Sequence, residues 1–207
     1  MSRTLLQSGG FFIYGALAPF FFTLNLVPCS FFFSPLAFLI DHHYNYIMSK
    51  KKIPTTPAIL ALKANNAVFT LHSYKYEDKG GTRVSSARLG VDEHCVIKTL
   101  VMEDETAKPL IILMHGDKEV STKALARVLG VKSITPCKPD TAHKHTGFMV
   151  GGTSPFGTRK PLIVCMEKTI ADLPEIFINA GARGLLAKMS PSELVRILEP
   201  REVSVAI

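Results

Sequence analysis

A glycine-rich stretch, residues 146–161 (TGFMVGGTSPFGTRKP), is the clearest candidate for chemistry in this chain. Pro155 fixes its own φ and favours an extended conformation at Ser154, and two cations, Arg159 and Lys160, follow. The glycines that allow positive φ and close approach of the backbone to a ligand are Gly151, Gly152 and Gly157. The pattern favours a loop that cradles a phosphate, a ribose or an ester carbonyl. An ordinary turn between strands is the alternative, because Gly, Ser and Pro also dominate turns.

A second candidate is Lys98, in the middle of the apolar segment VIKTL (residues 96–100). Alternation along a strand places Lys98 on one face with Val96 and Leu100. An ammonium group held in a cleft on that face could meet a phosphate or a developing oxyanion. The alternative is a lysine at a solvated edge, with its stem packed on apolar neighbours.

His72 and Tyr74 share one face of another expected strand, where they could flank a nucleotide or form a half-buried polar face. His143 and His145 are a weak metal signal, because no cysteine or carboxylate lies at ligand spacing, so we expect no metal. The sequence contains no GxSxG, HExxH or Walker A motif.

Composition divides the 207 residues near Met48. Residues 1–47 hold nine of the 13 phenylalanines and only two formal charges, so the net charge of +7 lies on residues 48–207. That part has the size of one domain, and its positive charge suits a nucleic acid or another polyanion. The four cysteines are scattered without a CxxC pair, which is typical of a reducing compartment, and we expect a cytoplasmic protein.

The hydrophobic extension, residues 1–47, has two interpretations. Its uncharged run from Phe11 to Ile40 is long enough to cross a bilayer, although three prolines interrupt it. It could therefore be a membrane or targeting segment. We favour Met48 as the true start, with the preceding residues translated from upstream sequence.

The pattern of the remaining chain predicts an α+β fold, with surrounding helices and a mixed, mostly antiparallel, barrel-like β-sheet. Helices are expected at residues 57–66, 84–90, 121–130 and 191–198, with N-caps at Thr56, Ser121 and Ser190. Strands are expected at residues 67–76, 96–103, 109–115, 162–166, 176–179, 185–189 and 203–207.

Taken in order, five segments resemble the YbaK/EbsC family of aminoacyl-tRNA deacylases and the related editing domain of bacterial prolyl-tRNA synthetases. They are HSY (72–74), VIKTL (96–100), KALARVLG (123–130), TGFMVGGTSPFG (146–157) and AGARGL (180–185). The resemblance covers residues 54–198 and implies a YbaK-like fold.

The resemblance also implies an activity. Members of the family hydrolyse mischarged aminoacyl-tRNA in trans, and the YbaK branch typically clears Cys-tRNA(Pro). Cysteine and proline are close in size, so a synthetase pocket cannot reject cysteine by binding alone. Catalysis in that branch is thought to use the thiol of the substrate, in a lyase-like cyclisation, without cofactor or metal. The implied partners are aminoacyl-tRNA, above all tRNA(Pro), and prolyl-tRNA synthetase; a membrane is a partner only if residues 1–47 are genuine.

By position, the resemblance gives catalytic roles to Lys98 and Gly151. The substrate-binding residues that it implies are Tyr74, His72, Gly152, Ser154, Pro155, Gly157, Asn179, Gly181 and Arg183. The chain departs from the usual SGGKRGLD pattern, with Asn179 in place of a serine and Leu186 in place of an aspartate, which weakens the assignment of cysteine as the amino acid removed. A non-catalytic module that binds tRNA or a synthetase is the alternative function.

Overall fold

A computed structural model describes residues 53–207, so the expectations for residues 1–47 lie outside the described part. The strands are β1 (Thr70–Ser73), β2 (Val96–Asp104), β3 (Pro109–His115), β4 (Ile134–Pro136), β5 (Ile163–Glu167), β6 (Ile176–Ala182), β7 (Leu185–Met189) and β8 (Arg201–Val203). The helices are α2 (Pro57–Ala64), α3 (Gly81–Leu89), α4 (Thr122–Leu129), α5 (Pro139–Thr146) and α6 (Pro191–Leu198), with short 3-10 helices at Glu93–Cys95 and Lys168–Asp172.

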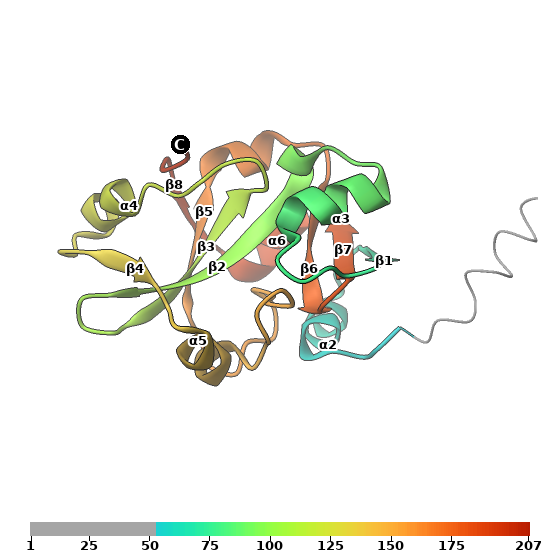
Figure 1. Cartoon of the computed structure of the whole chain (residues 1–207), viewed down its shortest axis with the longest axis horizontal. Helices are drawn as coiled ribbons and strands as arrows, with labels where there is room; N and C mark the ends of the chain where they lie inside the picture. The colour runs from blue at the N-terminus through green and yellow to red at the C-terminus, as the bar shows by residue number, and fades with distance from the viewer. Residues whose placement is uncertain (1–52) are drawn as a thin grey trace, which may run out of the picture. The chain divides into compact units, whose positions relative to one another are not determined.

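The strands form one mixed sheet in the order β1-β7-β6-β2-β3-β5-β8, and β4 pairs with the far end of β2. The β1/β7, β6/β7, β2/β3 and β2/β4 pairs are antiparallel, whereas β2/β6, β3/β5 and β5/β8 are parallel. The long strands β2 and β3 run diagonally across the centre of the molecule (Figure 1). The predicted α+β class is confirmed, and the strands expected at residues 96–103 and 109–115 form the antiparallel hairpin of β2 and β3.

Polar caps start three helices where the sequence predicts them. The hydroxyl groups of Thr56, Ser121 and Ser190 accept hydrogen bonds from the N–H groups of the first turns of α2, α4 and α6. The Thr56 hydroxyl also donates to the Ala180 carbonyl, which joins the start of α2 to β6. Each cap satisfies an N–H group that the helix itself leaves without a partner.

Apolar side chains cover both faces of the sheet. On β6, Ile176 and Ile178 belong to a core that α2 and α6 cover, and Phe177 points to the opposite face, toward α3. In Figure 1, α3 lies in front of β6 and β7, and α6 lies behind the sheet. Phe148 and Phe156 also insert into the α2/α6 core, so both ends of the glycine-rich loop are anchored there.

The structure differs from the sequence prediction at five elements. The strand expected at residues 67–76 is limited to Thr70–Ser73, and α3 begins at Gly81, three residues before the start of the expected helix. The strand expected at residues 203–207 was wrong, because β8 ends at Val203 and a buried Glu167 carboxylate accepts the N–H groups of residues 205 and 206. The sequence analysis missed α5 and β4, because α5 is polar and carries no apolar periodicity.

None of the helices in residues 53–207 has the length and apolar character that a membrane span requires.

Gly157 should tolerate alanine much less well than Gly130. Both residues have positive φ, +63° and +73°, but a Cβ at Gly157 would lie 2.4 Å from the Pro57 carbonyl oxygen, whereas Gly130 faces open space. We expect Gly130→Ala to lower the free energy of unfolding by about 1 kcal/mol, from backbone strain alone. Gly157→Ala should lower it by about 3 kcal/mol, because a steric clash is added.

Urea denaturation of both variants measures this difference. Equal losses of stability would contradict the close packing of the loop against α2.

Candidate active site

A row of side chains crosses one face of the sheet and contains three of the predicted site residues, His72, Asn179 and Lys98. His72 pairs with Leu186, and Leu186 pairs with Asn179. Ile97 of β2 and Ile178 of the parallel strand β6 are the last paired residues of these strands, so Lys98 and Asn179 are the next residues along them. Lys98 also pairs with Met114 on β3. Because paired residues of adjacent strands lie on the same face, Asn179 is the lateral neighbour of Lys98.

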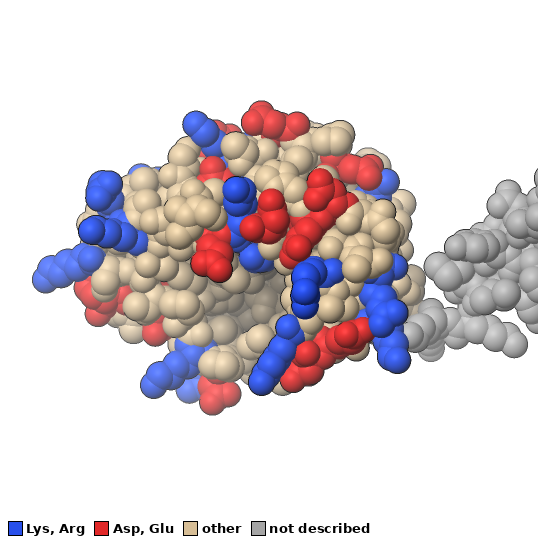
Figure 2. Space-filling model, turned by 45° about the horizontal axis from the view of Figure 1, so that its top comes forward, with Lys and Arg blue, Asp and Glu red and all other residues tan. Residues whose placement is uncertain are grey.

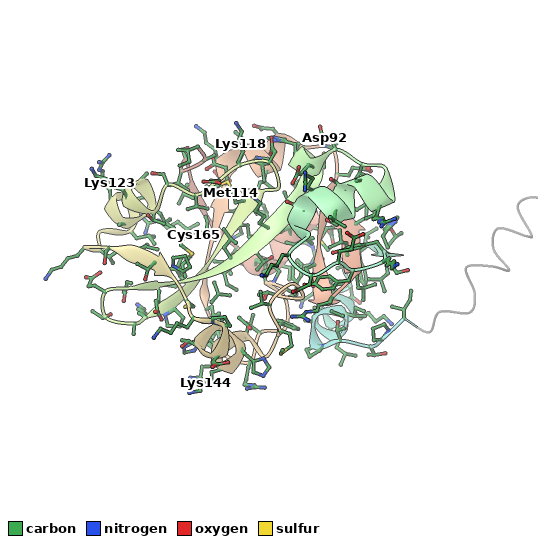
Figure 3. All side chains as sticks on the ribbon, viewed as in Figure 1. Asp92, Met114, Lys118, Lys123, Lys144 and Cys165 are labelled. Atoms are coloured by element: carbon green, nitrogen blue, oxygen red, sulfur yellow. The ribbon has the colours of Figure 1, made fainter. Side chains whose placement is uncertain are left out.

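The Lys98 ammonium group is half-buried and already has an acceptor. Its Nζ donates to the carbonyl oxygen of Lys118, at 2.8 Å, in the turn that follows β3. Figure 3 labels Lys118 at the end of that strand and Met114 within it. Figure 2, which shows this side of the sheet obliquely, reveals a hollow at the centre of the molecule with basic and acidic side chains at its rim.

The segment 149–152 is fixed by hydrogen bonds to its backbone. The Asn179 amide donates to the Gly151 carbonyl oxygen at 3.1 Å, and Arg183 Nε donates to the Val150 carbonyl oxygen at 2.9 Å. The Gly152 N–H closes a turn onto the Met149 carbonyl oxygen at 2.9 Å. The predicted residues Asn179 and Arg183 therefore hold the loop that carries Gly151. Because Asn179 belongs to β6, it connects this loop to the strand next to β2, on which Lys98 lies.

Side chains do not fit at the glycines of this loop. Gly151 has a φ of +84°, and a Cβ there would lie 2.6 Å from the Tyr76 hydroxyl. At Gly152 a Cβ would lie 3.0 Å from the Arg183 backbone nitrogen. The expected positive φ is confirmed at Gly151 and Gly157, and all three glycines pack closely on protein atoms; their close approach to a ligand stays a prediction.

The sequence analysis missed Tyr76. Its ring lies against Gly151, and the Arg183 guanidinium carbon is 5.2 Å from the ring centroid, within the range of a cation–π contact. Tyr76 thus forms a wall between the Gly151 backbone and the β6–β7 turn. The alternation of His72, Tyr74 and Tyr76 was the available signal, but β1 ends before Tyr76 is reached.

A cleft of about 350 Å³ opens beside this wall. Its lining residues are Pro57, Gly147, Phe148, Met149, Gly152, Gly181, Ala182 and Arg183. Glycine backbone and apolar side chains make up most of the lining, and Arg183 provides a cation. The volume is sufficient for a small ligand or the end of a larger one. The structure brings together Gly152, Gly181 and Arg183 in this cleft, as a group adjacent to Gly151 and Asn179.

Tyr74 and His72 lie farther along the face. The Tyr74 N–H donates to the Gly184 carbonyl oxygen at 2.9 Å, and burial raises the pKa of its phenol. The His72 ring packs edge-on against Phe177, at 5.5 Å between centroids, and burial lowers its pKa. His72 lies on the edge strand β1, so β7 and β6 separate it from β2, the strand of Lys98.

Ser154 and Pro155 lie beneath the loop surface. Ser154 is fully buried, and its hydroxyl accepts from the Phe156 N–H at 3.3 Å, a local turn contact. Pro155 is also buried, and Gly157 packs on the Pro57 carbonyl. The three residues shape the loop from within, and their predicted contact with substrate stays a prediction.

The described cysteines are poor nucleophiles. Burial raises the pKa of Cys95 and Cys165, and burial with the neighbouring Glu103 carboxylate raises the pKa of Cys137 to about 12. Thiols with raised pKa values carry little thiolate at neutral pH. Within residues 53–207, no group of three His, Cys, Asp or Glu side chains is arranged to hold a metal ion.

Comparison with curated proteins gives relatives in tRNA aminoacylation and editing. The chain is 24% identical over 152 residues to EbsC of Enterococcus faecalis, a candidate Cys-tRNA(Pro)/Cys-tRNA(Cys) deacylase, covering 72% of this chain and 93% of that protein. It is 27% identical over 113 residues to a proline–tRNA ligase of Thermodesulfovibrio yellowstonii, covering 55% of this chain but only 18% of the ligase.

A solved structure has the same fold. The crystal structure of a candidate trans-editing enzyme for prolyl-tRNA synthetase superposes with a TM-score of 0.67 at 18% identity, covering 75% of this chain and 99% of that one. The model of the aminoacyl-tRNA editing domain matches residues 81–197, which include Lys98, Gly151 and Asn179. Because this match spans more than half of the sequence, the chain belongs to the aminoacyl-tRNA editing domain family.

Proposed function

We propose that this chain removes wrongly attached amino acids from tRNA in trans, and that its substrate is Cys-tRNA(Pro). The bond cleaved is the ester between the amino acid and the 3′-terminal ribose. The observation that supports this most is the hydrogen bond from Asn179, on the strand next to that of Lys98, to the Gly151 carbonyl oxygen, with all three residues inside the family match. The name of the relative EbsC supports the choice of cysteine and proline.

In this proposal each group has a physical task. The Lys98 ammonium binds the terminal phosphate or adenosine and stabilises negative charge that develops as the ester breaks. The Gly151 backbone, which Tyr76 contacts where a Cβ would stand, receives the aminoacyl ester at close range. Asn179 and Arg183 fix the loop before substrate arrives, so that little reorganisation accompanies the reaction.

The nucleophile is the thiol of the substrate itself. Its sulfur attacks the ester carbonyl carbon, the ester C–O bond breaks, and the proton of the thiol passes to the released ribose oxygen. Water then opens the resulting thiolactone to free cysteine. The raised pKa values of the described cysteines are consistent with a protein that supplies position and charge rather than a thiolate.

Lys98→Ala should abolish most of the deacylation. We expect the rate on Cys-tRNA(Pro) to fall by at least about 100-fold, a loss typical of removing one donor to a developing oxyanion. Fold stability should hold, because the contact of Lys98 with the Lys118 carbonyl is half-exposed. Release of labelled cysteine from the charged tRNA measures the rate.

Lys123→Ala, an exposed change on α4, is the matched control and should keep the wild-type rate. If wild type and Lys98→Ala both matched spontaneous hydrolysis on Cys- and Ala-tRNA, the enzyme assignment would fail. Salt-dependent tRNA binding without turnover would then favour a non-catalytic binding module.

The contact between Gly151 and Tyr76 should be visible as energetic coupling. Gly151→Ala is expected to lower kcat/KM by about 10- to 100-fold, because the new methyl group meets the Tyr76 hydroxyl and displaces the loop. Adding Tyr76→Phe removes the nearest atom and should recover part of the loss.

Gly81→Ala is the control, since Gly81 also has positive φ, at +61°, but faces open space. If the losses of kcat/KM from Gly151→Ala and Tyr76→Phe simply added in the double variant, the contact between these residues would not be the cause of the Gly151→Ala defect.

Replacing protein thiols should leave activity intact. The Cys95→Ser/Cys137→Ser double variant is expected to deacylate Cys-tRNA(Pro) within about twofold of wild type, because thiols of raised pKa are weak nucleophiles. A loss of more than tenfold in a folded double variant would point to a protein thiol in the reaction.

A further inference from the structure

One segment of the described chain is rich in positive charge and poor in carboxylates. Residues 53–207 contain 20 Lys and Arg against 16 Asp and Glu, a surplus of four. Residues 131–166 contain five Lys and Arg against a single carboxylate, Asp140, which is the same surplus. Four of these five cations, Lys138, Lys144, Arg159 and Lys160, lie at α5 or in the loop that follows it, and the fifth, Lys132, precedes β4.

Backbone pairing brings the cations of this segment together in space. The Arg159 N–H donates to the Thr146 carbonyl oxygen, and the Lys160 N–H donates to the His145 carbonyl oxygen, both at 3.1 Å. These bonds place residues 159 and 160 against the last turn of α5. The exposed residues of this surface are Lys138, Lys144, Arg159 and Lys160, and we call them the α5 basic surface.

Figure 3 labels Lys144 at the edge of the molecule, on α5, where its side chain points away from the body. Basic side chains stand along the same lower edge in Figure 2.

The α5 basic surface is continuous with the cleft. The Arg159 Nε lies 3.7 Å from where a Cβ of Gly147 would stand, and Gly147 lines the cleft. His143 Nδ1 lies 3.2 Å from the carbonyl oxygen of Phe148, another lining residue. An anionic chain that ends in the cleft would therefore pass over α5.

Helix stability explains only part of this charge. Lys144 is in the last turn of α5, where a cation interacts favourably with the helix dipole. Lys138, however, is at the N-cap of α5, where a cation is unfavourable, and its side chain makes no capping hydrogen bond. Among residues 53–207, no member of the α5 basic surface forms an ion pair, whereas Arg88, Lys188 and Arg196 each contact a glutamate.

We infer that the α5 basic surface binds the phosphodiester backbone of RNA whose 3′ end enters the cleft. Exposed cations without carboxylate partners can exchange small counterions for phosphates, which makes binding favourable and dependent on salt. The inference rests on the proposed function for the identity of the RNA, which is the acceptor end of a tRNA. It adds a surface that binds the part of this tRNA outside the cleft.

Two charge-reversed variants of the full chain test the inference. Lys144→Glu/Lys160→Glu reverses two members of the surface, and Lys123→Glu/Arg127→Glu applies the same net change to exposed residues of α4. Binding of uncharged tRNA is measured by fluorescence anisotropy across a salt series. The α5 variant should bind at least about tenfold more weakly at low salt, and the slope of log K against log salt should fall by about two.

Kinetics provide the second readout. For deacylation of Cys-tRNA(Pro), the α5 variant should show a raised KM with kcat within about twofold of wild type, because the groups at the ester are unchanged. The α4 variant should match wild type in both measurements. Thermal unfolding of the variants confirms that each remains folded.

The outcomes separate this inference from the proposed function. If the α5 variant bound tRNA more weakly but the wild type had no deacylase activity, the RNA-binding role of the α5 basic surface would be supported and the proposed deacylase function would be rejected. An active wild type whose tRNA affinity and KM are unchanged in the α5 variant would overturn the surface alone. Binding to anionic phosphatidylserine vesicles with no affinity for tRNA would also overturn it, in favour of a membrane contact.

Discussion

Backbone packed directly against backbone is the constraint on which the candidate site depends. The loop from Gly147 to Gly157 runs between α2, the β6–β7 turn and the segment after β1, and a Cβ at Gly151, Gly152 or Gly157 would lie within about 3 Å of an atom of one of these. Phe148 and Phe156 anchor its two ends in the core. Small residues and buried anchors together give this loop one position, although it has no regular secondary structure.

The sheet then determines what this loop faces. Parallel pairing of β2 with β6 makes Asn179 the neighbour of Lys98, and the Asn179 amide binds the loop carbonyl of Gly151. One polar side chain thus connects the strand beside that of Lys98 to the glycine backbone. A register shift of one residue in β6 would turn Asn179 to the opposite face and break that connection.

Much of this arrangement was predictable from the sequence. The caps at Thr56, Ser121 and Ser190 are local signals, and the alternation around Lys98 identified the strand and its face. The polar helix α5 was missed because neither periodicity nor a capping side chain marks it. Tyr76 was missed because its role arises from a contact with Gly151, 75 positions along the chain, which no local pattern encodes. The burial of Ser154 is likewise a product of tertiary packing.

The hydrogen bond between Lys98 and the Lys118 carbonyl has a consequence for how the site would respond to an anion. The ammonium group has already given up part of its hydration in the free protein, since a protein oxygen replaces water on one side. The ammonium group has three N–H donors, so an arriving anion would meet those that the Lys118 carbonyl leaves free, and the lysine would at no stage be buried without a partner. The turn that carries Lys118 would keep its place, because Thr82 donates to the Gly116 carbonyl and Glu119 pairs with Ile207.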